Sequence, residues 1–184
     1  MQTRIILGVD PGSVRTGFGL IQVLPTVPPK LITYGAWQLK QYATFTLRMQ
    51  HIYRHMVALL QEYTPDEMAI ESVFQGKNVQ SMLKLGRAQG VAIAAAIAYT
   101  IPLIEYAPCK VKQAITGQGN ASKAQVAAMV GRLLEVSLQP IFLDASDALA
   151  IALCHGQQRP TPTAPPKQWA QFVAKHPHRV VSRL

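Results

Sequence analysis

Residues 5–13 read IILGVDPGS, a run of five apolar or small residues that ends in an acid and a turn. A continuous apolar run of this length predicts a strand buried on both faces, because a half-exposed strand would alternate apolar and polar side chains. The strand should end at Asp10, since the Pro-Gly pair that follows favours a turn. We therefore expect a central strand that presents Asp10 at its carboxyl end.

The rest of the pattern predicts an α/β fold. Further elements are expected in the order strand, strand, helix, strand, helix, strand and final helix, at residues 16–23, 31–39, 52–63, 67–71, 79–99, 101–106 and 144–155. The first three strands should form an antiparallel meander, because their connections are too short for crossovers. Lys110 to Thr116 is expected to be a short helix, and Ser122 with Gln125 predicts a helix start with a capping box. Together these elements indicate a mixed five-stranded sheet flanked by helices.

Composition divides the chain into a globular part and a tail. Of the 184 residues, 49% are hydrophobic, which predicts a folded domain at 1–158. Four prolines between positions 160 and 166, and five basic residues with no acid from Arg159 onward, predict a flexible basic tail at 159–184. The net charge of +9 favours a polyanionic partner, although a basic surface without a ligand fits the charge as well.

Nothing in the sequence predicts export or a membrane. Met1 to Arg4 leads directly into the first expected strand, so we expect no signal peptide and a cytoplasmic protein. Cys109 and Cys154 lack a metal-binding spacing and are expected to be apolar residues in a reducing compartment. The apolar stretch Val91 to Ala98 is too short to span a bilayer. It predicts buried core, a dimer interface, or both.

Acidic residues are scarce, so their positions are informative. Four of the nine acids follow apolar segments, namely Asp10, Glu71, Asp144 and Asp147. The first two would lie side by side if the strands that they end are neighbours, and the other two, three residues apart, should share a face near a helix start. Clustered carboxylates repel one another unless divalent cations neutralise them. Two Mg²⁺ ions held this way can activate water and stabilise the leaving oxygen of a phosphodiester.

Each acid also has a simpler interpretation. Asp144 fits a helix N-cap and Asp147 a favourable first-turn charge. Asp10 fits a turn former before Pro11. Glu71 is harder to explain in this way, because an acid at the end of a buried strand needs a partner. Only the four together indicate a metal-dependent nuclease.

The sequence resembles the RuvC family of Holliday-junction resolvases across residues 4 to 156. The matching segments, in chain order, are GVDPGS at 8–13, TGFG at 16–19, AIE at 69–71, LKLGRAQGVA at 83–92, VKQ at 111–113, GQG at 117–119, KAQV at 123–126 and DASDALAIA at 144–152. The resemblance implies an RNase H-like fold and a homodimer that resolves four-way junctions by paired symmetric nicks in DNA recombination and repair. It also implies partnership with a branch-migration complex of the RuvA and RuvB type.

The resemblance further assigns roles to single residues. It implies that Asp10, Glu71, Asp144 and Asp147 are catalytic and hold two Mg²⁺ ions, with Mn²⁺ as an alternative. Candidate DNA contacts are one aromatic and five basic residues, namely Phe74, Lys77, Lys84, Arg87, Lys112 and Lys123. A loop aromatic beside basic residues can stack on unpaired bases, but it can also close a core, and a lone lysine is usually solvated surface.

Two other functions compete with the nuclease. Sugar kinases and actin-like ATPases share an Asp-x-Gly turn, but they need two related domains around a nucleotide, and the folded part here is about one domain. A non-catalytic architectural DNA binder would explain the charge. It would leave the four spaced acids unexplained.

Overall fold

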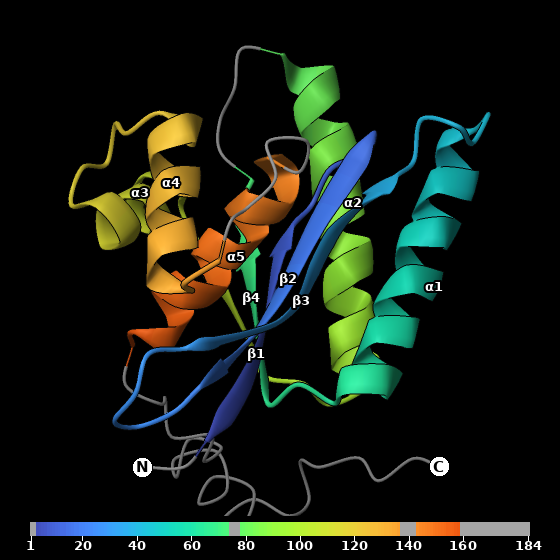
Figure 1. Cartoon of the computed structure of the whole chain (residues 1–184). Helices are drawn as coiled ribbons and strands as arrows, with labels where there is room; N and C mark the ends of the chain where they lie inside the picture. Colours follow the sequence, from blue (N-terminus) through green and yellow to red (C-terminus); the bar gives the residue numbers. More distant parts are fainter. Residues whose placement is uncertain (1–2, 74–77, 137–142, 159–184) are drawn as a thin grey trace, which may run out of the picture.

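The computed structural model describes residues 3–73, 78–136 and 143–158 and shows a sheet between two groups of helices (Figure 1). Its elements follow the expected order: β1 (Arg4–Asp10), β2 (Arg15–Val23), β3 (Lys30–Gln38), α1 (Phe45–Tyr63), β4 (Glu67–Glu71), α2 (Val79–Ala98), β5 (Leu103–Tyr106), α3 (Pro108–Thr116), α4 (Lys123–Leu133) and α5 (Leu143–Gly156). The expected tail at 159–184 lies outside the described residues.

The five strands form one mixed sheet in the order β3-β2-β1-β4-β5. β1 pairs antiparallel with β2 and parallel with β4, so the predicted central strand does lie in the middle. β2 pairs antiparallel with β3, and β4 pairs parallel with β5. The predicted mixed sheet, with its antiparallel first three strands, is therefore confirmed.

Some element ends differ from expectation. β5 begins at Leu103 rather than at position 101, directly after Pro102, which has no N–H for a ladder bond. α3 begins at Pro108 rather than at Lys110, because proline suits the first helical position, where no N–H is needed. The predicted capping box of Ser122 and Gln125 is present at the start of α4.

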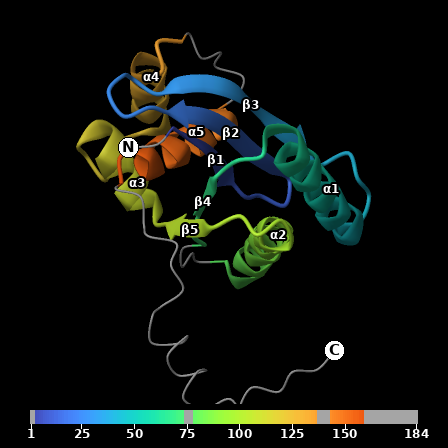
Figure 2. The same ribbon diagram turned by 90° about the horizontal axis from the view of Figure 1, so that it is seen from below.

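Both faces of the sheet are covered (Figure 2). α1 and α2 pack on one face over a core of Leu7, Val9, Leu20, Ile52, Met56, Met68, Ile70 and Ala92, among others. α3, α4 and α5 cover the other face around Ile6, Ile21, Ala69, Val111, Val126, Leu149 and Ile151, among others. Because β1 is covered on both faces, its continuous apolar run is accounted for.

α5 lies directly on the backbone of β1 and β2. A Cβ atom added to Gly8 would lie 2.1 Å from the carbonyl oxygen of Ala148, and one added to Gly17 would lie 2.1 Å from that of Asp144. At Gly19 the same atom would meet the Leu149 side chain at 2.6 Å. Glycine at these positions is what allows the helix to approach so closely.

A series of largely buried hydrogen bonds connects the other end of α5 to the sheet. The hydroxyl of Tyr106 lies 2.8 Å from Nδ1 of His155, and Nε2 of His155 lies 2.8 Å from Oε2 of Glu67. Arg4 donates to the same Glu67 oxygen at 2.8 Å and to the carbonyl of Gly156 at 3.3 Å. These contacts join the last turn of α5 to three strands of the sheet.

α2 has one buried side and one exposed side. Within the stretch from Val91 to Ala98, Ala92, Ala95 and Ala96 are buried, whereas Ile97 is 65% exposed. The outward face of α2 is formed by Val79, Leu83, Gly86, Gly90 and Ile97. Side-chain atoms added to either glycine would meet nothing within 4 Å. None of the described helices is long and apolar enough to cross a membrane.

The contact between Gly17 and α5 gives a stability prediction. Gly17→Ala should lower the free energy of unfolding by about 3 kcal/mol, because the added methyl group meets backbone rather than a movable side chain. Urea denaturation followed by circular dichroism measures this. Gly119→Ala is the control, since its nearest atom is 3.4 Å away, and it should change stability by less than about 0.5 kcal/mol. Equal effects from the two substitutions would contradict the close approach.

Candidate active site

Two of the predicted acids end neighbouring parallel strands. Asp10 is the last residue of β1 and Glu71 the last of β4, and the two strands are in register through Val9 and Ile70. A side-chain hydrogen bond links Asp10 to Glu71. The parallel pairing of β1 with β4 therefore brings these two carboxyl groups together.

Both carboxyl groups are held in an environment that disfavours their charge. Burial, and then the charges of Glu71 and Asp147, raise the pKa of Asp10 well above its usual range. Burial also raises the pKa of Glu71. The hydrogen bond between the two groups adds to the rise in the pKa of Asp10 and partly opposes the rise in the pKa of Glu71. Two adjacent carboxylates in this position call for a compensating positive charge.

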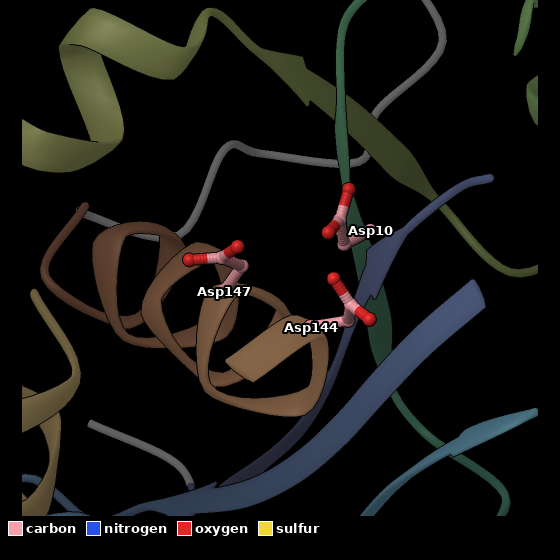
Figure 3. A group of neighbouring side chains, drawn as sticks. All are labelled: Asp10, Asp144 and Asp147. Atoms are coloured by element: carbon pink, nitrogen blue, oxygen red, sulfur yellow. The ribbon is translucent and has the colours of Figure 1, made fainter. Parts of the chain in front are cut away.

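α5 supplies the other two acids. Asp144 lies in its first turn and Asp147 follows three residues later, so both face the end of β1 (Figure 3). One carboxylate oxygen from each of Asp10, Asp144 and Asp147 lies within 4.8 Å of the others, with all three side chains half-buried. Gly17 on β2 allows Asp144 to lie this close to the strands, because a Cβ atom at position 17 would be 2.1 Å from the carbonyl oxygen of Asp144.

Glu71 joins this group through a neighbouring cavity. The cavity has a volume of about 200 Å³ and is lined by Glu71, Lys112, Lys123, Val126 and Asp147, among others. Thus all four acids predicted from the sequence lie around one connected region, at the carboxyl ends of β1 and β4. Their catalytic roles stay a prediction.

Basic side chains contact the two helix-borne acids. Nζ of Lys123, at the start of α4, lies 2.5 Å from Oδ2 of Asp147. Burial lowers the pKa of Lys123, but its hydrogen bond and charge interaction with Asp147 outweigh burial and raise the pKa overall. Nη1 of Arg15 lies 2.9 Å from Oδ2 of Asp144, and its Nε donates to Oε1 of Gln38 at 3.2 Å.

The sequence did not point to Arg15 or to Thr16. The buried hydroxyl of Thr16 accepts from the N–H of Gly12 at 3.2 Å and donates to its carbonyl at 2.8 Å, which fixes the turn after Asp10. The signal available was proximity along the chain, since both residues lie within four positions of the Asp-Pro-Gly turn. That Arg15 would reach an acid 129 positions later required the fold.

The six predicted DNA contacts are distributed unevenly. Lys112 and Lys123 lie beside the acids, in the cavity described above. Lys84 and Arg87 lie on α2, across the sheet from α5, and the Arg87 guanidinium carbon lies 5.8 Å from the Phe45 ring centre. Phe74 and Lys77 lie outside the described residues.

The donor set fits a hard divalent cation. Carboxylate oxygens are the ligands that Mg²⁺ and Mn²⁺ prefer, and the residues that could hold such an ion are Asp10, Glu71, Asp144 and Asp147. Burial, followed for Asp10 by the nearby charges of Glu71 and Asp147, raises the pKa of both carboxyl groups, and a cation bound here would favour their charged forms. Together with Lys112 and Lys123, the site can bind a phosphodiester and activate water against it.

Comparisons with known proteins agree with this chemistry. The family model for crossover junction endodeoxyribonuclease RuvC matches residues 6–155. The protein of that name from Bacteroides fragilis is 48% identical to this chain, and the alignment covers 98% of this chain and 97% of that protein. The one from Cytophaga hutchinsonii is 50% identical, and the alignment covers 96% of this chain and 88% of that protein. Among solved structures, Thermus thermophilus RuvC in complex with a Holliday junction substrate aligns with a TM-score of 0.77 and 30% identity, covering 83% of this chain and 92% of that one.

The raised pKa of Asp10 predicts how stability depends on pH. The unfolded chain loses this proton near the ordinary pKa of 3.8, whereas the folded chain keeps it to higher pH. Folding therefore takes up a proton, and stability falls as pH rises through that window, by up to about 1.4 kcal/mol per pH unit. Asp10→Asn removes the effect, so its stability advantage over the wild-type chain should grow from pH 4 upward in chelator.

Urea denaturation between pH 4 and pH 8 measures this advantage. Glu62→Gln is the control, because it removes an exposed carboxylate from α1 on the opposite face of the sheet. Its stability curve should run parallel to that of the wild-type chain. If the Asp10→Asn curve ran parallel too, the crowded carboxyl pair would not exist in solution.

Proposed function

This chain belongs to the RuvC family of crossover junction endodeoxyribonucleases, and from that premise we propose that it resolves Holliday junctions in DNA recombination by metal-dependent hydrolysis at the four-acid site. The observation that supports the site is the meeting of Asp10, Asp144 and Asp147, with Glu71 hydrogen-bonded to Asp10. Family membership sets aside both the kinase-like ATPase and the non-catalytic DNA binder.

Asp10, Glu71, Asp144 and Asp147 would together hold the metal. We propose two Mg²⁺ ions per site, with Mn²⁺ as a substitute, because four carboxylates supply enough oxygen ligands for a pair. The ions supply Lewis acidity, a lowered pKa of bound water and stabilisation of the leaving 3′ oxygen. The acids that would hold them come from a rigid sheet and a closely packed helix, which keeps the ligand positions fixed.

Lys123 and Lys112 would bind the phosphate beside the cut. Lys123 already contacts Asp147, so its ammonium group is held within reach of the site. With Asp147 serving as a metal ligand, Lys123 would be available to contact a phosphate oxygen. Phe74, Lys77, Lys84 and Arg87 are proposed as further DNA contacts, with Phe74 stacking on bases near the crossover.

The exposed face of α2 supports a homodimer. A four-way junction needs two symmetric cuts, and an isologous dimer provides two identical sites. The outward face of α2 is apolar at Val79, Leu83 and Ile97, which are 64%, 51% and 65% exposed, and its glycines leave room for a second helix. We place the dimer interface there. Residues 1–158 form the nuclease domain in this proposal, the protein acts in the cytoplasm, and a branch-migration complex of the RuvA and RuvB type is its partner.

Glu71→Gln tests the metal mechanism. The amide keeps the shape of the side chain but removes its charge, so cleavage of a synthetic four-way junction in Mg²⁺ should fall by more than about 100-fold, since changes to outer-shell groups alone cost 10–100-fold. Junction binding in chelator should stay within about twofold, or tighten because a negative charge is lost. Glu62→Gln should cut at the wild-type rate. A Glu71→Gln protein that cuts at that rate would remove Glu71 from the mechanism.

Ile97→Glu tests the dimer. A charge in an apolar interface should shift the protein to monomers in sedimentation experiments, because the carboxylate would be buried without a partner. On a cruciform plasmid the product should change from linear to singly nicked DNA. Val27→Glu is the control, since Val27 is 47% exposed but lies between β2 and β3. A dimeric Ile97→Glu protein would place the interface elsewhere.

A further inference from the structure

Gln89 is a buried polar residue with no part in the site described so far. It is 8% exposed and lies in the second half of α2, where it contacts one residue of β4 and one of β5. α2 covers the face of the sheet opposite α5, so Gln89 approaches the end of β4 from behind the acids. A buried amide is costly unless it forms hydrogen bonds, so its partners indicate its role.

The amide nitrogen of Gln89 makes two hydrogen bonds. It donates to the main-chain carbonyl of Glu71 at 3.1 Å and to the carboxylate oxygen Oε2 of Glu105 at 2.8 Å. Both partners only accept, so the amide must turn its NH₂ group toward them. Glu105 thereby fixes the orientation of the group that holds Glu71.

The end of β4 lacks one of its strand neighbours at this point. β4 pairs with β1 only as far as Ile70 and Val9, so Glu71 lies one residue past the last pair with β1. On the other side β4 still pairs with β5, through Glu71 and Tyr106, and the N–H of Ser72 donates to the Tyr106 carbonyl. β1 has by then turned away at Pro11, which has no N–H to donate. The Gln89 amide supplies a donor to this half-supported backbone.

We propose that Gln89 is a positioning residue that holds Glu71 in the orientation needed for metal binding. It acts through the Glu71 backbone and touches neither metal nor DNA. The inference rests on the proposed function, in which Glu71 is a metal ligand. Loss of the amide donor would leave the Glu71 carbonyl without this hydrogen bond. The Glu71 side chain would then adopt several orientations, and only some of them would allow its carboxylate to bind the ion.

Three variants separate this role from simple packing. Gln89→Met keeps the size but has no donor, and Gln89→Glu keeps the shape but offers only acceptors. The third is the exchange Gln89→Glu with Glu105→Gln. It lets the amide at position 105 donate to the carboxylate at position 89, while the Glu71 carbonyl still lacks its donor. Gln50→Met, on the exposed side of α1, is the matched control.

The readouts are Mn²⁺ binding by calorimetry, the Mg²⁺ concentration for half-maximal junction cleavage, junction binding in chelator, and the melting temperature. All three variants should weaken Mn²⁺ binding and raise the half-saturating Mg²⁺ concentration by about 10-fold to 100-fold. Junction binding should stay within twofold. The exchange should recover the melting temperature lost in Gln89→Glu without recovering metal affinity, and the control should match the wild-type protein.

Recovery of Mn²⁺ affinity in the exchange variant would overturn the inference, because Gln89 would then matter only for its pairing with Glu105. Wild-type metal affinity in Gln89→Met would overturn it as well. If Gln89→Met does not fold, the exchange variant still decides. Failure of the proposed function would look different, since Glu71→Gln would then keep its metal affinity and its cleavage whatever the Gln89 variants do.

Discussion

The geometry of the site depends on one contact between backbones. α5 lies on β1 and β2 with no side chain between them at Gly8 and Gly17, whose added Cβ atoms would fall 2.1 Å from helix carbonyl oxygens. This contact brings Asp144 and Asp147 to the strand end that carries Asp10. A larger residue at either glycine would move α5 away from the sheet and separate the acids. A substitution in this contact would therefore change both the packing of α5 and the arrangement of the acids.

The negative charge of the four acids is compensated by several neighbouring groups. Asp10 is hydrogen-bonded to Glu71, Lys123 contacts Asp147, and Arg15 contacts Asp144. These contacts offset part of the cost of gathering the acids in the folded chain before a metal or DNA is bound.

The sequence predicted the parts of the structure that depend on local patterns. The apolar run before Asp10 predicted the central strand, and the acids could be found because few others are present and each follows an apolar segment. Contacts between distant residues could not be predicted in this way. Nothing local distinguishes Gln89 from a solvated helix glutamine, and the pairing of Arg15 with Asp144 appears only once β2 and α5 are placed side by side. The helix stretch ending at Ala98 reads as uniformly apolar, yet only one side of it is buried.

The close seating of α5 also limits how this protein can change over generations. A Cβ on Gly8 would come within 2.9 Å of the Ala152 Cβ and nearer still to the main chain, so no reduction of residue 152 alone could make room for it. A substitution at this contact between α5 and the two strands would therefore require a matching substitution in the other element. Arg15 and Gln38 are exposed to solvent, so substitutions at these two positions carry no such restriction. Substitutions should therefore accumulate at such exposed positions, and the contact between α5 and the two strands should change most slowly.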